Sequence, residues 1–268
     1  MFNKNRMLKH IDYGIVSSVI VLVIIGLMTI SSATHAFSDN GDTKKLIMQA
    51  AFTVVSLIIA AVIISIDYNT IGGYYKIFYV IGVLSLIIVL IFGSERNGAK
   101  AWLGVGQFGI QPAEFFKIVM IITIAKVLEE IENINTLKNF GKIVLVAILP
   151  MILIQIQPDT GTNMIFAVTI FGMIFYAGLD KKIIWGGFFT VIVAVSAVWF
   201  FDILQNYQKH RVLVFLNPEL DMSGVGYNAH MAKTAIGAGW FFGSGLYNGT
   251  LTEGNFIPEL HTDFIFSV

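Results

Sequence analysis

The stretch LIMQAAFTVVSLIIAAVIISI, residues 46–66, decides the fold class, because it runs for 21 residues without a charged side chain. An α-helix needs about 20 apolar residues to cross the hydrocarbon core of a bilayer. Residues 13–30 form a second uncharged stretch, of 18 residues, and no small-residue cleavage site follows it before the next polar loop. We therefore expect a membrane-spanning helix in each stretch, the first being a span and not a signal peptide.

Further apolar stretches follow at residues 77–92, 110–128, 143–156, 163–179 and 183–201. The chain is 56% hydrophobic and only 13% charged, which is far from the composition of a soluble domain. The sequence therefore predicts an all-α polytopic membrane protein, a multi-helix bundle with one long extracytoplasmic loop. The expected domains are a bundle of seven spans at 1–202, the loop at 203–263 and the start of a truncated eighth span at 264–268.

Charge and cysteine usage exclude several classes of protein. The formal net charge is zero, so there is no strongly basic surface and nucleic acid is not an expected partner. The chain has no cysteine, which excludes disulfides, thiolate metal sites and a cysteine nucleophile. Short loops on the side of the N-terminus hold nine Lys and Arg against four on the other side. The positive-inside rule then predicts a cytoplasmic N-terminus.

Four ionisable residues are expected to meet at the outer half of the bundle, and ionisable groups at the membrane mark functional sites by default. They are Glu114, Lys117, Asp159 and Asp263. Each has a structural alternative. Glu114 and Lys117 lie three apart on one helix face and could form a structural ion pair. Asp159 and Asp263 could each cap the helix that follows.

Three loop segments also have two interpretations. Trp102 beside Lys100 is either an interfacial anchor or part of a lip that receives an anionic, amphipathic ligand. The cluster at 209–211 is either a solvated patch or a phosphate site, since Arg pairs well with phosphate oxygens. Residues 229–246 are apolar but interrupted by glycine, so we expect an interfacial or re-entrant piece.

The chain resembles the SEDS family, the RodA, FtsW and SpoVE proteins, in four motifs that occur in order. They are NGAKAWLGVGQFGIQPAEFFKI (97–118), QPDTGT (157–162), YQKHRVLVFLNPE (207–219) and NFIPELHTDFIFSV (255–268). The ending resembles the RodA branch more than FtsW. The resemblance implies a ten-helix fold and a peptidoglycan glycosyltransferase of the plasma membrane, with its active site on the outer face, acting in cell elongation and shape maintenance. It implies lipid II as substrate and a class B penicillin-binding protein and membrane lipids as partners.

The resemblance also implies roles for individual residues. Asp263 matches the essential acidic residue, and Glu114, Lys117 and Asp159 match residues of the central cavity. The candidates for substrate binding are Lys100, Trp102, Gln111, Lys209, Arg211, Glu259, His261 and Thr262. No cofactor is required by the sequence and metal ligands are unknown, although a divalent cation such as Mg²⁺ or Mn²⁺ could neutralise the departing diphosphate.

Two departures from the family pattern concern the second half of the chain. Gly-Ser-Gly stands at 243–245, where the family often has a lysine between the glycines, and the family continues through helices beyond residue 268. We therefore expect the 268-residue chain alone to be incompetent, with a mobile loop end. Two other functions remain open: a flippase that transports lipid II, and a non-catalytic scaffold for a penicillin-binding protein.

Overall fold

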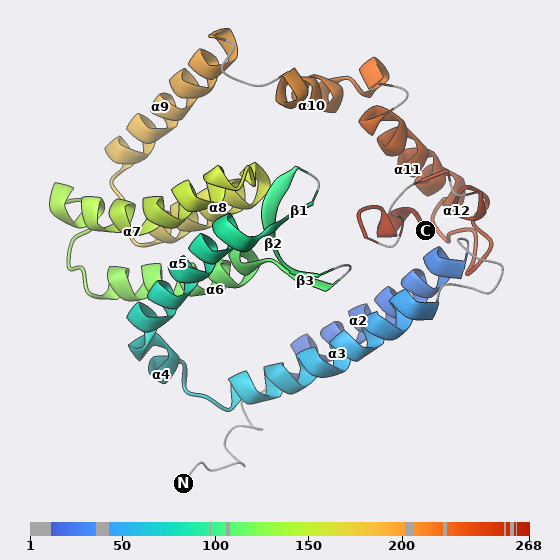
Figure 1. Ribbon diagram of the computed structural model, residues 1–268, viewed down its shortest axis with the longest axis horizontal. Helices are drawn as coiled ribbons and strands as arrows, with labels where there is room; N and C mark the ends of the chain where they lie inside the picture. Colours follow the sequence, from blue (N-terminus) through green and yellow to red (C-terminus); the bar gives the residue numbers. More distant parts are fainter. Residues whose placement is uncertain are drawn as a thin grey trace. The chain divides into compact units, whose positions relative to one another are not determined.

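The computed structural model describes residues 12–35, 43–96, 98–105, 108–201, 206–221, 224–254, 256–257, 260 and 262–268. The chain is mostly helical (Figure 1). It divides into two compact units, and each is described by itself below. The first unit joins Met1–Ser65 to Val198–Val268, and the second is Ile66–Ala197.

The second unit is built around four helices that pack side by side (Figure 1). These are α5 (Tyr75–Phe92), α6 (Pro112–Glu129), α7 (Leu137–Ile156) and α8 (Thr160–Tyr176), preceded by the short α4 (Tyr68–Gly73) and followed by α9 (Lys181–Phe200). Local chemistry sets where these helices begin. Pro112 occupies the first turn of α6, where its missing N–H costs nothing. The Thr136 hydroxyl caps α7 by accepting a hydrogen bond from the Asn139 N–H.

The core of this unit is an aromatic stack across three helices. Phe116 of α6 is 1% exposed, and its ring lies 5.9 Å from Tyr79 of α5 and 6.1 Å from Phe166 of α8. Gly82 of α5 faces the same ring, and a Cβ atom at this position would overlap the Phe116 side chain. The missing side chain therefore allows α5 and α6 to approach closely.

Pro150 lies inside α7 and removes one hydrogen bond from the helix. Because proline has no N–H, the carbonyl four residues earlier, at Val146, loses its normal helical partner. The Tyr79 hydroxyl of α5 donates to this oxygen at 2.8 Å. A side chain from a neighbouring helix thus satisfies a carbonyl that no water could reach in a bilayer.

Polar contacts tie the helices together at one end of the second unit. The Glu130 carboxylate accepts hydrogen bonds from the Tyr75 hydroxyl at 2.8 Å and the Lys142 ammonium at 3.1 Å. The hydrogen bond from Tyr75, followed by that from Lys142, holds the pKa of the Glu130 carboxyl below its usual value. At this end the Asn135 side chain also accepts from the Asp180 N–H at 2.7 Å. The loops that follow α6 and α8 therefore lie at the same end of the second unit.

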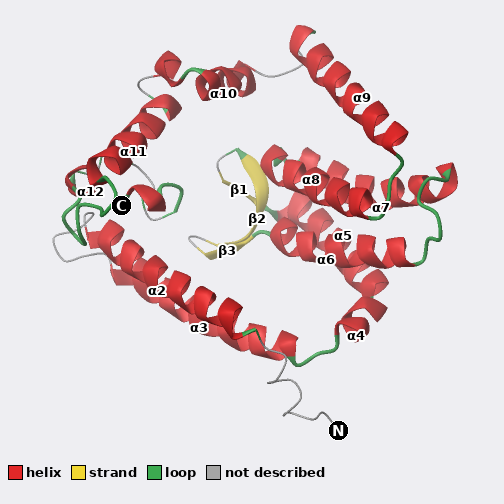
Figure 2. Cartoon of the chain, turned by 180° about the vertical axis from the view of Figure 1, so that it is seen from behind, coloured by secondary structure: helices red, strands yellow, loops and turns green. Residues whose placement is uncertain are grey.

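A small antiparallel sheet lies at the opposite end of these helices (Figure 2). It consists of β1 (Ser94–Arg96), β2 (Ala99–Val105) and β3 (Phe108–Ile110). The expectation of an all-α protein is therefore wrong in this segment. Arg96 pairs with Ala99 across a two-residue link, and Gly98 adopts φ +83° there. Asn-Gly links of this kind favour tight hairpins, which the apolar periodicity could not reveal.

The first unit contains an apolar helical hairpin and a set of shorter helices (Figure 1). The hairpin is α2 (Tyr13–His35) and α3 (Thr43–Ile64), and the others are α10 (Asn206–Leu216), α11 (Val225–Gly239) and α12 (Thr250–Glu253), with 3₁₀ turns at Pro218–Asp221 and Ile265–Ser267. The segment expected as a long loop therefore carries several helices. Its interior is small, and joins Ala33 of α2 and Ala232 of α11 to Ile257 and Leu260.

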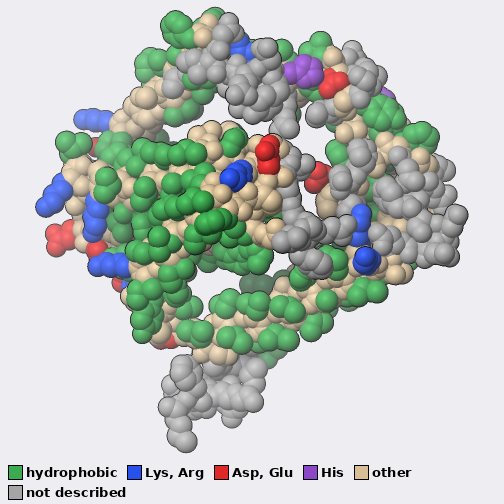
Figure 3. Space-filling model, viewed as in Figure 1, with side chains coloured by type: hydrophobic (Ala, Val, Ile, Leu, Met, Phe, Trp, Pro, Cys, Tyr) green, Lys and Arg blue, Asp and Glu red, His purple; other side chains and the backbone are tan. Residues whose placement is uncertain are grey.

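All seven stretches expected to span the membrane are helical. Five helices are long and apolar enough to cross a bilayer, namely α2, α3, α5, α7 and α9. The remaining two are α6, which carries four charged residues, and α8, which has 17 residues. The segment expected to begin an eighth span, 264–268, contains the 3₁₀ turn Ile265–Ser267, and the span itself stays a prediction. Hydrophobic side chains cover much of the surface of the long helices, as a multi-pass membrane protein requires (Figure 3).

Candidate functional site

Asp159 links the beginnings of two helices in the second unit. Its Oδ1 atom caps α8 by accepting from the Thr162 N–H at 3.1 Å, and its Oδ2 atom accepts from the Gln111 amide at 2.6 Å. Gln111 is itself the residue that precedes α6. The carboxylate therefore joins the N-termini of α6 and α8, whose macrodipoles stabilise negative charge.

Glu114 and Lys117 form the ion pair expected from their spacing. The Lys117 ammonium lies 2.8 Å from the Glu114 Oε1 atom, within the first two turns of α6. Lys117 is mostly covered, with 24% of its side chain exposed, whereas 52% of the Glu114 side chain is exposed. The pair is thus partly open at the surface of the unit and is not sealed in its core.

Substitutions at Asp159 separate its capping role from a role for its charge. Asp159→Asn keeps an N-cap acceptor, and the Gln111 amide can turn its oxygen toward the new NH2 group, so we expect unfolding stability within about 1 kcal/mol of the parent. Asp159→Ala removes the cap and is expected to cost about 1 kcal/mol. Thermal unfolding in detergent measures both. If Asp159→Asn is stable but inactive, the carboxylate charge is needed for function, whereas full activity would leave Asp159 with capping alone.

Replacing Lys117 with methionine leaves Glu114 without its ion partner. Exposed pairs contribute about 0–1 kcal/mol and broken buried pairs cost about 3–5 kcal/mol, so for this half-covered pair we expect a loss of about 1–2 kcal/mol. The double variant Glu114→Gln/Lys117→Met leaves no unpaired charge and should recover most of that loss. A double variant as unstable as Lys117→Met would show that packing of the lysine stem matters instead.

Three amide side chains near Asp159 were not among the predicted site residues. Gln157 is 1% exposed and donates to the Leu86 carbonyl at 3.3 Å, and Asn163 donates to Gln155 at 2.9 Å. The Oδ1 atom of Asn163 is buried and has no hydrogen-bond partner among the described residues. It can accept one more hydrogen bond, for example from a hydroxyl. The sequence did offer a signal, because amide residues stand at or beside the ends of the apolar stretches 143–156 and 163–179.

Asp263 lies in the first unit, on an anchored segment. Its own side chain is exposed. On the N-terminal side Ile257 and Leu260 are fully buried against α2 and α11, and on the C-terminal side Phe264 packs on the same cluster. The Ser267 hydroxyl closes the last turn by donating to the Phe264 carbonyl at 2.6 Å. An open carboxylate thus sits on a short segment that is held on both sides.

The expected meeting of Asp263 with Glu114, Lys117 and Asp159 stays a prediction, since Asp263 belongs to one unit and the other three to the other. Among the substrate-binding candidates, Gln111 contacts one of these residues through its hydrogen bond to Asp159. Thr262, which precedes Asp263, is exposed.

The remaining candidates for substrate binding are distributed over both units. Lys100 of β2 donates to the Ile91 carbonyl at 3.2 Å, and Trp102 of the same strand is half-buried, less exposed than its loop position suggested. In the first unit the Lys209 ammonium lies 5.7 Å from the centre of the Trp199 ring, a cation–π contact. Glu259, His261 and the side chain of Arg211 lie outside the described residues.

The described residues contain no group of three His, Asp or Glu side chains that could hold a metal ion. The two potential ligands nearest to Asp263 in sequence, Glu259 and His261, are outside that part of the chain. A divalent cation such as Mg²⁺ or Mn²⁺ therefore stays a prediction.

Comparison with known proteins places this chain among peptidoglycan enzymes. It is 32% identical to the peptidoglycan glycosyltransferase MrdB of Escherichia coli K12 over 259 residues, which cover 97% of this chain and 68% of that protein. It is also 32% identical to the probable peptidoglycan glycosyltransferase FtsW of Aeromonas salmonicida over 262 residues, which cover 96% of this chain and 66% of that protein. The chain therefore spans about two thirds of the length of these relatives.

Solved structures share the fold. A chain of a peptidoglycan synthase complex matches with a TM-score of 0.74 and 28% identity, covering 85% of this chain and 65% of that one. The Rod shape determining protein RodA of Thermus thermophilus matches with a TM-score of 0.60 and 26% identity, and the match covers 69% of this chain and 60% of RodA. The sequence profile of the family of FtsW, RodA and SpoVE cell cycle proteins matches residues 13–268, which include every predicted site residue. The chain belongs to this family of cell cycle proteins.

Proposed function

We propose that this chain is a peptidoglycan glycosyltransferase that polymerises lipid II into glycan strands. The observation that carries the proposal is the family match over residues 13–268, together with curated relatives that are peptidoglycan glycosyltransferases at about one third identity. By homology the enzyme class is the one expected from the sequence motifs. The exposed carboxylate of Asp263, on a segment anchored at Leu260 and Phe264, supports the same assignment.

In the proposed reaction a sugar hydroxyl of one saccharide attacks the anomeric carbon of a second saccharide, which is still joined to its diphosphate. Asp263 accepts the proton of that hydroxyl while the new glycosidic bond forms. The bond between the anomeric carbon and the diphosphate oxygen breaks, and the diphosphate leaves with the bonding electrons. A single in-line displacement inverts the anomeric configuration. Lys209, Arg211 and Lys100 are the cations proposed to stabilise the departing charge.

The proposed orientation places the N-terminus in the cytoplasm and the active site on the outer face of the plasma membrane. Lysines gather in the second unit at the end that holds Glu130 and Asn135; they are Lys126, Lys138, Lys142, Lys181 and Lys182. This end is opposite to the sheet and the Gln111–Asp159 contact, and Figure 3 shows Lys and Arg side chains gathered there. The positive-inside rule assigns such an end to the cytoplasm.

A class B penicillin-binding protein is the proposed partner, because a chain of a peptidoglycan synthase complex shares this fold with a TM-score of 0.74. We also propose the elongation branch of the family. The ending FIPELHTDFIFS supports it, whereas identity does not separate the branches, since MrdB and FtsW relatives both reach 32%.

Labelled lipid II, incubated without nucleotide with the partner and a version of the protein extended by a homologous C-terminal segment, tests the proposal. Glycan strands on a gel are the expected product. A flippase would instead move labelled lipid II across a liposome membrane and make no strands. A scaffold would do neither, and strands would then require a polymerising partner. Absence of strands from the extended protein with its partner would refute the glycosyltransferase assignment.

A further inference from the structure

Three consecutive aromatic residues follow α11 and are exposed over most or all of their surface. Trp240 is 86% exposed, Phe241 is 96% exposed and Phe242 is fully exposed. Burying a side chain of this size away from water is favourable by about 1.5–3 kcal/mol of free energy. An exposed aromatic tip of this kind indicates a surface that something covers.

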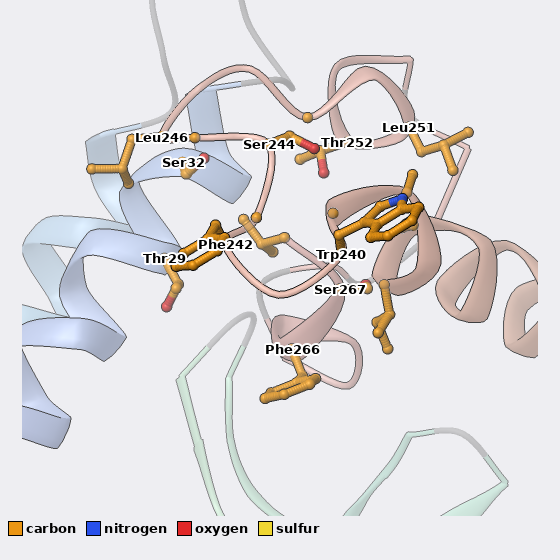
Figure 4. A pocket seen from close by; sticks show the side chains of 18 residues that line it. Thr29, Ser32, Trp240, Phe242, Ser244, Leu246, Leu251, Thr252, Phe266 and Ser267 are labelled. Carbon is orange, nitrogen blue, oxygen red and sulfur yellow. The ribbon is translucent and has the colours of Figure 1, made fainter.

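Glycine residues close the turn that carries these three side chains. Gly243 and Gly245 adopt φ +73° and +94°, a region that favours glycine. The Gly243 N–H donates to the Gly239 carbonyl at 2.7 Å and closes a tight turn across the three aromatic residues. Figure 4 shows Trp240 and Phe242 lining an open pocket of about 340 Å³ together with Thr29 and Ser32 of α2.

Tyr247 fixes this turn to the end of the α2 membrane span. Its hydroxyl lies 2.8 Å from the Ser31 hydroxyl, and its N–H donates to the Ser32 hydroxyl at 3.1 Å. The Tyr247 ring also lies 5.2 Å from the His35 ring. Residues 240–247 therefore share the depth of the last turns of α2.

That depth is the boundary between hydrocarbon and water. With 23 residues, α2 is about 34 Å long, slightly more than the roughly 30 Å of a hydrocarbon core. Its apolar run ends at Ile30, and four of the next five residues, Ser31, Ser32, Thr34 and His35, are polar. The polar end of α2 thus lies at the headgroup level, where Trp and other aromatic residues are enriched.

We propose that Trp240–Phe242 is a membrane anchor, and that its side chains insert into the interfacial region of the bilayer. The same end of the hairpin carries Lys44 and Lys45 in the first turn of α3, a charge that favours anionic lipid headgroups. Because α12, Ile257 and Leu260 follow the tip in sequence and pack within the same unit, the anchor holds the segment of Asp263 near the headgroups. This inference does not depend on the chemistry proposed for Asp263.

A single nitroxide label tests the anchor, since the chain has no cysteine of its own. The variant Phe241→Cys carries the label in liposomes of phosphatidylcholine and phosphatidylglycerol. The matched control is Leu137→Cys, another large apolar residue, 90% exposed, at the polar start of α7. Electron paramagnetic resonance then compares the relaxation caused by oxygen, which concentrates in lipid, with that caused by a water-soluble nickel chelate.

The expected result is stronger relaxation by oxygen at position 241 and stronger relaxation by the nickel chelate at position 137. Chelate access at 241 equal to that at 137 would overturn the proposal, because the tip would then lie in water. Protection of position 241 from both agents would also overturn it, since a second copy or a partner protein would then cover the tip.

Discussion

Asp263→Asn should lower glycan synthesis from lipid II by at least about a hundredfold, the lower end of what a positioned general base contributes. The amide keeps the size of the side chain but cannot accept the hydroxyl proton at neutral pH. Because the Asp263 side chain is exposed and the segment is held by Leu260 and Phe264, folding should not change. Strand synthesis by the protein extended with a homologous C-terminal segment, in the presence of its partner and at equal protein amounts, measures the effect.

Asp67→Asn is the matched control for this experiment. It also converts an exposed carboxylate to an amide, but at the N-cap of α4, where the Asp67 side chain accepts from the Asn69 N–H. Asparagine caps a helix about as well as aspartate, so activity and stability should both persist. Near-normal strand synthesis by Asp263→Asn would contradict the assignment of the base, whereas equal losses in both variants would point to a general effect of removing charge.

Gly82→Val should destabilise the second unit by about 2–3 kcal/mol, the upper part of the range for overpacked cores. A Cβ atom at Gly82 already overlaps the Phe116 ring, and valine adds two further carbons at the same place. Phe116 cannot retreat easily, because the Tyr79 and Phe166 rings both pack against it. The midpoint of thermal unfolding in detergent should therefore fall.

Gly172→Val tests whether the loss comes from this contact. Gly172 also lies inside an apolar helix, α8, but a Cβ atom there would meet nothing within 4 Å. Valine is a slightly better helix former than glycine, so its stability should stay unchanged or rise by a few tenths of a kcal/mol. If both variants were equally unstable, helix propensity and not the Phe116 contact would explain the result.

Hydrophobic length predicted the helices well, but not the features that depend on turns and caps. The stretch 143–156 was expected to begin where the apolar run begins, yet α7 starts at Leu137, because Thr136 caps a polar first turn. The sheet at 94–110 was missed because its strands are short and its signal is the hairpin link at Gly98. Both omissions concern polar segments, where bilayer thickness imposes no constraint on sequence.

Within the site, local contacts were predictable and long-range contacts were not. The pair of Glu114 and Lys117 follows from a spacing of three along a helix. The contact between Gln111 and Asp159 joins residues 48 positions apart, and no periodicity indicates it. The meeting of Asp263 with the cavity residues is of the same kind and stays a prediction.

The contact between Tyr79 and the Val146 carbonyl has an evolutionary consequence. Pro150 is acceptable in α7 only while a hydroxyl on α5 satisfies the carbonyl that it leaves without a helical partner. Loss of that hydroxyl alone would strand a polar group in hydrocarbon, whereas loss of the proline would make the hydroxyl dispensable. Mutations at the two positions should therefore be order-dependent, with the proline replaced before the tyrosine.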